Sequence, residues 1–165
     1  MDGEKGGRKW ETLGESGSHM ITGEYHNSLD EKGRLLIPSR VRSEIAGNLL
    51  IVTQGVDKCL WLFPPEEWKR ISENLMASTS IFQARARLIQ RRIIAPAQET
   101  EIDKLGRINI SQSLREYAGL SKDAVILGIK SYLEIWDEAV YRDYWTDKEP
   151  EFQEAAEELG KIVTI

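Results

Sequence analysis

The sequence has few of the residues on which catalytic and metal sites most often depend. Its 165 residues include one cysteine and two histidines, so an internal disulfide is excluded and a Cys/His metal site has almost no ligands. No glycine-rich phosphate loop occurs, and no histidine lies near a serine or cysteine nucleophile motif. We therefore predict no catalytic residues, no metal site, no cofactor and no small-molecule substrate.

Long apolar runs are missing as well. No segment approaches the ~20 apolar residues that a membrane-spanning helix requires, and no secretory signal pattern opens the chain. Cys59 stands in the apolar run Cys-Leu-Trp-Leu-Phe, where a buried structural thiol is the favoured interpretation. These absences predict a cytoplasmic protein with no membrane partner.

The net charge of −5 at first argues against nucleic acid as a partner, but the charge is unevenly distributed. Residues 134–165 hold ten acidic and three basic side chains, and residues 1–19 hold four acidic and three basic ones. Residues 20–133 are left with sixteen basic and thirteen acidic side chains. A mildly basic surface predicts weak binding by one subunit, so useful affinity for nucleic acid would need several subunits acting together.

The most informative feature that is present is an internal repeat. The segment Ser28-Leu-Asp-Glu-Lys-Gly-Arg-Leu-Leu-Ile37 returns as Glu101-Ile-Asp-Lys-Leu-Gly-Arg-Ile-Asn-Ile110, at an offset of 73 residues. The shared motif Asp-x-x-Gly-Arg consists of Asp30, Gly33 and Arg34 in the first copy and of Asp103, Gly106 and Arg107 in the second. A duplicated unit this short seldom buries its own core, so we expect the two copies to pack together.

The motif predicts a tight turn followed by a strand. Asp at the first position and Gly at the last fit a type I turn, in which the carboxylate accepts backbone N–H groups and Gly takes a positive φ. The next residues alternate, with Arg34 outward and Leu35 inward, and with Arg107 outward and Ile108 inward, as in a half-buried strand. Each copy is therefore expected to be a β-hairpin with an arginine leaving its tip.

The aspartates, glycines and arginines of the motif call for different interpretations. For Asp30, Gly33, Asp103 and Gly106 a structural role in the turn is favoured. The arginines could simply pair with the turn aspartates and hold the hairpins. We favour a binding role for Arg34 and Arg107, because a turn needs no arginine and because arginine is the usual partner of phosphates and guanine edges.

The remaining pattern predicts the same order of elements in both halves. The first half should contain a hairpin over 21–37, a helix capped by Ser39 and running through Ala46, strands over 49–53 and 59–63, and a helix opened by Pro64-Pro65. The second half should contain a hairpin over 99–110, a helix near 112–118, strands over 124–129 and 132–136, and a helix from Asp137. Between them, a helix is expected from Ile81 to Ile94, ending before Pro96.

We divide the chain accordingly into a first repeat over 20–80, a connecting helix within 81–97, a second repeat over 98–145 and an acidic, helical tail over 146–165. Residues 1–19 are expected to be a disordered or cloning-derived extension, because Gly17-Ser-His-Met20 has the form of a cloning scar.

Two surface clusters have more than one interpretation. Arg85, Arg87, Arg91 and Arg92 on the connecting helix could contact phosphates, but an ordinary solvated face or a subunit interface is favoured. Ile81, Leu88 and Ile89 on the same helix are core or subunit contacts. Trp145, with Tyr141 and Tyr144 close in sequence, is a candidate for a contact between subunits.

The doubled motif and its flanks resemble the MraZ family over about residues 20–145. The flanks are Arg-Leu-Leu-Ile-Pro38 after the first turn, Leu114-Arg-Glu-Tyr-Ala-Gly-Leu120 after the second, and Leu-Glu-Ile-Trp136-Asp. The resemblance implies a β-rich α+β fold of two pseudo-symmetric, AbrB-like repeats with swapped hairpins and flanking helices. It also implies a ring-like homo-oligomer that binds direct repeats in double-stranded DNA, is associated with the nucleoid, and regulates transcription of the bacterial division and cell-wall gene cluster.

The resemblance maps the DNA-contacting arginines of the family to Arg34 and Arg107. Lys32 and Lys104 are neighbouring candidates, although they do not align with each other. Ser111 stands where the first copy has Pro38, so the halves need not contact DNA alike. Two alternatives remain open: an antitoxin-like module on the same fold, whose acidic tail binds a basic protein, and an enzyme of unrecognised type with a deep polar pocket.

Overall fold

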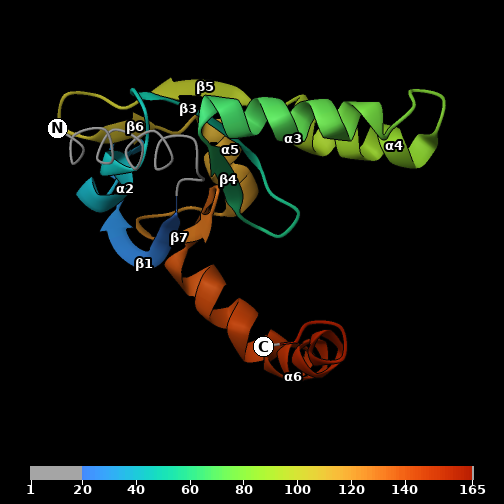
Figure 1. Ribbon diagram of the computed structural model, residues 1–165. Coiled ribbons are helices and arrows are strands. Elements are labelled where there is room, and N and C mark those ends of the chain that lie inside the picture. The colour runs from blue at the N-terminus through green and yellow to red at the C-terminus, as the bar shows by residue number, and fades with distance from the viewer. Residues whose placement is uncertain (1–19, 165) are drawn as a thin grey trace, which may run out of the picture.

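A six-stranded antiparallel sheet runs through both halves of the chain (Figure 1). The computed structural model describes residues 20–164. Within them the sheet has the order β1 (Ile21–Ser28), β7 (Asp123–Lys130), β8 (Leu133–Asp137), β4 (Leu60–Phe63), β3 (Leu49–Gln54) and β5 (Gln98–Glu101). A separate two-stranded ribbon pairs β2 (Arg34–Leu36) with β6 (Arg107–Asn109). The prediction of a β-rich α+β fold with two repeats is confirmed.

Helices surround the sheet and extend beyond it. They are α2 (Ser39–Ser43), α3 (Pro65–Ala77), α4 (Ala84–Ile89), which continues as the π-helical turn η1 (Gln90–Ile94), α5 (Gln112–Ala118) and α6 (Glu138–Gly160). Figure 1 shows α3 and α4 side by side, projecting from one side of the molecule, while α6 leads away from the sheet. Among residues 20–164, no helix combines the length and the apolar character needed to cross a bilayer.

The two strands that flank each repeated turn do not form a ladder with one another, which corrects the local hairpins predicted over 21–37 and 99–110. The first strand, β1, pairs with β7, and β5 pairs with β3, while β2 and β6 pair with each other. In the first copy, the isolated bridge between Leu29 and Leu35 is the remnant of the local hairpin. Strand exchange is favoured over the local hairpins because it places Leu35 opposite Ile108, where both side chains are fully buried.

Matching backbone hydrogen bonds tie the two repeats together. Ile37 N donates to Gly106 O at 2.8 Å, and at the equivalent place Ile110 N donates to Gly33 O at 3.0 Å. The main core is correspondingly shared between the halves, and its fully buried members include Leu35, Ile37, Leu50, Leu60, Ile108, Ile110, Ile126 and Leu133. Neither repeat could bury these side chains without the other, as expected for so short a duplicated unit.

The turn glycines are needed for two separate reasons. Gly33 has a φ of +78° and Gly106 has a φ of +85°, a backbone region that side chains with a Cβ rarely adopt. Each glycine also lies under an arginine of the other repeat, because a Cβ on Gly106 would stand 2.7 Å from Arg42 Cζ and a Cβ on Gly33 would collide with the Arg115 guanidinium. Arg42 Nε donates to Ile37 O at 3.0 Å, and Arg115 Nη1 donates to Ile110 O at 2.6 Å.

Several predicted helix boundaries were wrong. Ser39 is the first helical residue of α2 and not its cap, because Pro38 occupies the N-cap position and no side chain caps the helix. The same helix ends at Ser43, and the chain then turns so that Ile45 is buried before β3 begins. The connecting helix starts at Ala84 and not at Ile81, after a turn in which Gln83 N donates to Ser80 O.

The other elements lie where the pattern predicts them, within a few residues. The acidic tail is helical, but it is continuous with the helix that precedes it, so that α6 runs unbroken from Glu138 to Gly160 with Pro150 inside. Asp137 caps this helix, since its carboxylate accepts the Val140 N–H at 3.2 Å.

Gly47 provides a matched control for the turn glycines, because it has a φ of +77° but a Cβ placed on it would meet no atom within 4 Å. We expect Gly47→Ala to lower the free energy of unfolding by about 1–2 kcal/mol, the cost of left-handed backbone alone. Gly106→Ala should cost about 1.5–3 kcal/mol more, because Arg42 must give up its bond to the Ile37 carbonyl.

Urea denaturation of both variants measures these costs. Shortening the arginine should remove the additional cost, so Arg42→Ala and Gly106→Ala should be strongly non-additive. Equal costs at Gly47 and Gly106 would contradict the packing role of Arg42.

Candidate nucleic-acid interface

The β2–β6 ribbon brings the two motif arginines to one face. The register pairs Arg34 with Asn109 and Leu36 with Arg107, so these four side chains share the outer face. Leu35 and Ile108 occupy the inner face and are fully buried. The ribbon therefore holds two arginines diagonally across an outer surface that also carries the exposed side chains of Leu36 and Asn109.

The aspartate of each motif organises the turn that precedes its arginine. Asp30 Oδ1 accepts the backbone N–H groups of Lys32 and Arg34, each at 2.9 Å. Asp103 Oδ1 accepts those of Leu105 and Arg107 at the same distance. Backbone bonds close both turns, since Gly33 N donates to Asp30 O and Gly106 N donates to Asp103 O. Both arginines thus leave the ribbon from backbones with little freedom.

The same aspartates also pair with the arginine side chains. Arg34 Nε donates to Asp30 Oδ2 at 2.6 Å, and Arg107 Nε donates to Asp103 Oδ2 at 3.0 Å. Arg107 Nη1 lies 3.8 Å from Asp30 Oδ2, so one network joins both turns. The Arg34 and Arg107 side chains keep 32% and 26% of their surface exposed. The pairs engage the Nε–H groups, and a guanidinium carries four further N–H donors on its Nη atoms.

Hydrogen bonds to the charged form keep both carboxylates ionised. The backbone N–H of Arg34 is the largest cause that lowers the pKa of Asp30, and the Arg34 side chain and the Lys32 N–H act in the same direction. The backbone N–H of Arg107, followed by its side chain, lowers the pKa of Asp103 in the same way.

The two candidate lysines occupy different positions on the turns. Lys32 and Lys104 are both exposed, and the position equivalent to Lys32 in the second turn is Leu105, which is 66% exposed. Lys104 lines a hollow of about 230 Å³ together with Arg42, Asn48 and Asp103. Exposed Glu31 offsets the charge of Lys32 in the first turn, so only the second turn, through Lys104, adds net positive charge to the ribbon.

The arginines of the connecting helix lie elsewhere. Figure 1 places α4 at the far side of the molecule from β6. Arg92 Nη1 donates to Tyr117 Oη at 3.2 Å and its guanidinium stacks over that ring, while Arg87 Nη1 donates to the carbonyl of Ile81. The structure does not bring this cluster to the β2–β6 ribbon.

Sequence reasoning missed the roles of Arg42 and Arg115. These residues match at the repeat offset of 73, which is the signal that could have identified them. Each contacts the turn of the other repeat, however, and such contacts become evident only once strand exchange is known.

The cysteine and the histidine of the described residues do not form part of a cluster of catalytic or metal-binding side chains. Cys59 is buried as predicted, and burial raises the pKa of its thiol far above the usual range. His26 Nδ1 lies 3.9 Å from Glu138 Oε1 on an exposed surface. Residues 20–164 contain no group of three or more His, Cys, Asp or Glu side chains that could hold a metal ion.

Comparison with known proteins identifies close relatives. A family model described as "MraZ protein, putative antitoxin-like" matches residues 20–92 and again residues 93–162. A transcriptional regulator MraZ from Treponema denticola is 52% identical over 142 residues, which cover 86% of this chain and 99% of the relative. One from Treponema pallidum subsp. pallidum is 47% identical over 144 residues, which cover 87% of this chain and 97% of the relative.

A solved structure was also found, the solution structure of PHS018 from Pyrococcus horikoshii. It is 14% identical, covers 68% of this chain and 94% of its own, and has a TM-score of 0.29. Similarity at this level carries no conclusion about the present chain.

The aspartate–arginine network predicts a pH dependence of stability. A carboxyl group whose pKa is lowered by folding stabilises the protein above its unfolded pKa of 3.8 and loses this effect as the pH falls through its folded value. In Asp30→Asn/Asp103→Asn the amide oxygens can still accept the turn N–H groups but cannot neutralise the guanidinium groups. We expect the wild type to be more stable than this variant near neutral pH, and the difference to shrink below pH 3.8.

Urea unfolding midpoints of the wild type and the variant, measured near neutral pH and again below pH 3.8, test this expectation. Asp147→Asn, which changes an exposed carboxylate on α6 outside the turns, is the matched control. A difference that does not change with pH would rule out the charge of these carboxylates as its cause.

Proposed function

The chain belongs to the MraZ family, and from this premise we propose that it is a transcriptional regulator that binds double-stranded DNA through the outer face of the β2–β6 ribbon. The observation that carries the proposal is the placement of Arg34 and Arg107 on that face, each anchored by the aspartate of its own turn. A two-stranded ribbon fits the major groove of DNA, and an arginine there can bind the O6 and N7 atoms of guanine.

The aspartates determine what the arginines can bind. Asp30 and Asp103 neutralise much of the charge of Arg34 and Arg107, and they would repel a phosphate brought close to them. A guanine edge is neutral and accepts two N–H donors, so it suits a guanidinium that is already paired through Nε. The arginines therefore act as base readers, and their fixed orientation lowers the entropy cost of binding.

The lysines have the complementary role. Lys32 and Lys104 are exposed at the two turns, where they can neutralise DNA phosphates. Because residues 20–133 carry only three more basic than acidic side chains, one subunit would bind weakly. A ring-like homo-oligomer that places several ribbons on direct repeats would supply the missing affinity. Regulation of the division and cell-wall gene cluster, at the bacterial nucleoid, is the biological setting that fits this family.

Base readers and phosphate contacts can be separated by titration with DNA. We expect Arg34→Ala and Arg107→Ala each to weaken binding to tandem-repeat DNA by about 1–3 kcal/mol, roughly 5- to 150-fold, with a smaller effect on scrambled DNA. Lys32→Ala and Lys104→Ala should weaken both DNAs alike and each reduce the slope of log K against log salt by about 0.9.

Gel-shift titrations at several salt concentrations provide both readouts, and Arg142→Ala, an exposed arginine on α6, is the control. Undiminished affinity for repeat DNA in a folded Arg34→Ala/Arg107→Ala protein would reject the assignment.

An antitoxin-like protein-binding function is the second candidate, favoured by the description of the family and by the exposed acidic helix over residues 146–160. The two functions differ in what the tail does. If the chain acts by binding DNA, a protein that ends at residue 145 should keep its affinity for repeat DNA within about two-fold, because the tail carries no ribbon residue. A full-length protein that binds no repeat DNA, but binds a basic protein that the shortened chain no longer holds, would instead support the antitoxin-like role.

A further inference from the structure

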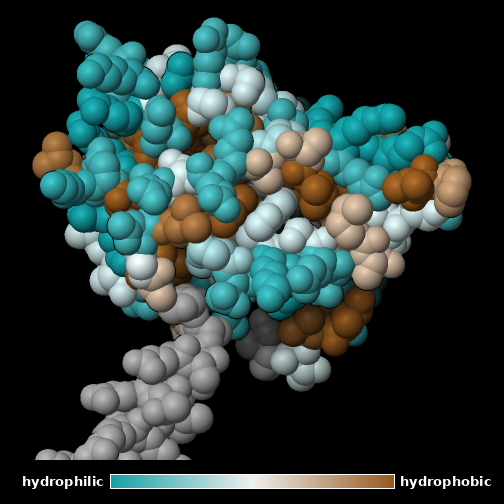
Figure 2. All heavy atoms as spheres, turned by 90° about the horizontal axis from the view of Figure 1, so that it is seen from above, coloured by the Kyte–Doolittle hydropathy of each residue, from teal (hydrophilic) through white to brown (hydrophobic). Residues whose placement is uncertain are grey.

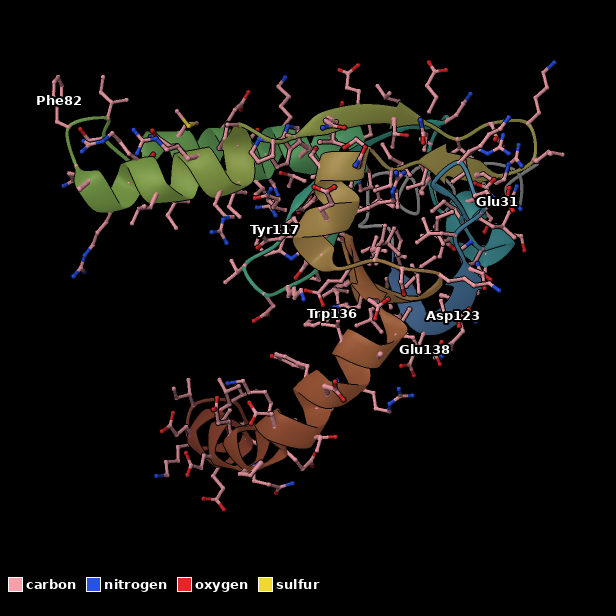
Figure 3. All side chains as sticks on the ribbon, turned by 180° about the vertical axis from the view of Figure 1, so that it is seen from behind. Glu31, Phe82, Tyr117, Asp123, Trp136 and Glu138 are labelled. Carbon is pink, nitrogen blue, oxygen red and sulfur yellow. The ribbon has the colours of Figure 1, made fainter. Side chains whose placement is uncertain are left out.

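The α3–α4 hairpin ends in an exposed apolar tip that nothing else in residues 20–164 covers. Figure 1 shows the two helices projecting from the sheet, and Figure 3 shows Phe82 at their outer end. Four side chains make up what we call the finger tip: Met76, Ile81, Phe82 and Leu88. Phe82 is 88% exposed, and Ile81 and Leu88 are each 63% exposed. Figure 2 shows hydrophobic side chains gathered at this end of the molecule.

The outer part of the α3–α4 hairpin, residues 74–97, is what we call the finger; it carries positive charge and no negative charge, and the glutamates of α3 (Glu66, Glu67 and Glu73) precede it. Residues 74–97 contain Arg85, Arg87, Arg91 and Arg92 and no aspartate or glutamate. An apolar patch rimmed by charge of one sign is typical of a surface that binds a protein of the opposite sign.

A groove lined by aromatic and acidic side chains lies away from the finger tip, between the sheet and the start of α6. It has a volume of about 490 Å³. Tyr141, Tyr144 and Trp145 of α6 form an aromatic wall beside Trp136, whose ring centroid is 4.9 Å from that of Tyr144 and 5.3 Å from that of Tyr141. We call this the aromatic groove.

The charged residues of the aromatic groove are acidic. Asp57 and Glu134 line it, and no lysine, arginine or histidine of the described chain does so. Burial raises the pKa of Tyr144, the negative charge of Asp57 raises it further, and the positive charge of Lys148 on α6 lowers it. Aromatic faces and carboxylates together favour arginine side chains, which can stack and pair at the same time.

We propose that the finger tip of one copy docks in the aromatic groove of a second copy, with Arg85 and Arg87 of α4 facing Asp57 and Glu134. The proposal rests on the ring-like assembly of the proposed function and names the surfaces that build it. The finger tip cannot dock in the groove of its own chain, because Phe82 lies at the outer end of the hairpin, away from Trp136 at the base of α6 (Figure 3). Apolar character and opposite charge match between the two surfaces, and both belong to every copy.

The contact is heterologous, since each copy contributes a different surface to each of its two junctions. Such head-to-tail contacts add copies until the rotation between neighbours closes a ring. Both surfaces lie outside the β2–β6 ribbon, so the outer faces of the ribbons stay available in the assembly.

Two variants separate the two halves of the junction. Phe82→Asp disables the finger tip, and Asp57→Arg/Trp145→Ala disables the aromatic groove. Light scattering of each purified full-length variant, without DNA, should give the mass of a monomer where the wild type gives several copies. Circular dichroism and thermal unfolding check that each variant is folded. Ile81→Asp is a second finger variant, and Ile162→Asp is the control, because Ile162 is exposed outside both surfaces.

Mixing the two defective variants is the decisive step. A finger-defective chain retains its groove and a groove-defective chain retains its finger, so the mixture should form a dimer and grow no further. A wild-type monomer, a variant that keeps the wild-type mass, or a mixture that stays monomeric would overturn the proposal. A wild-type assembly that fails to bind repeat DNA would reject the proposed function and leave the junction intact, so the two failures can be told apart.

Discussion

The pairing of β2 with β6 is the contact on which the core and the candidate site both depend. Its inner face buries Leu35 against Ile108, and its outer face presents Arg34 and Arg107. Because adjacent residues of a strand point to opposite sides, the register that closes the core also fixes where the arginines stand. A slip by one residue would bury the charges and expose the apolar side chains, so the position of the arginines is as firmly held as the core itself.

Arginine has two distinct uses in the repeats. Arg42 and Arg115 cover the turn glycines and hydrogen-bond to backbone carbonyls of their own repeats, so they belong to the packing between halves. Arg34 and Arg107 are held by carboxylates on the surface. An arginine that is oriented by its own turn and still partly exposed can serve a structural role and a binding role together, and the two interpretations of the motif need not exclude each other.

The repeat made much of this fold predictable, and its limits have a physical cause. Alternation in the sequence identifies which face of a strand is buried, but two equivalent copies offer each strand two equally apolar partners. The residue pattern therefore predicted local hairpins over 21–37 and 99–110, and only the family resemblance implied exchange of strands between the repeats, which is what is found. The ion pairs of Arg34 and Arg107 were foreseen as one interpretation, since an aspartate four residues earlier is visible in the sequence. The aromatic groove was not predicted. Its residues Asp57 and Tyr144 are far apart in the sequence, and only the folded sheet brings them together.

Strand exchange also bears on how the chain folds as it is synthesised. When residues 34–36 emerge from the ribosome, their partner at 107–109 has yet to be made. Until then the nascent first half exposes Leu35 and Ile37, which are fully buried in the finished protein. Pairing over so long a separation requires the closure of a large loop, which slows folding and prolongs exposure to aggregation. The two halves must therefore fold as one cooperative unit, late in translation, and neither can serve as a template for the other in advance.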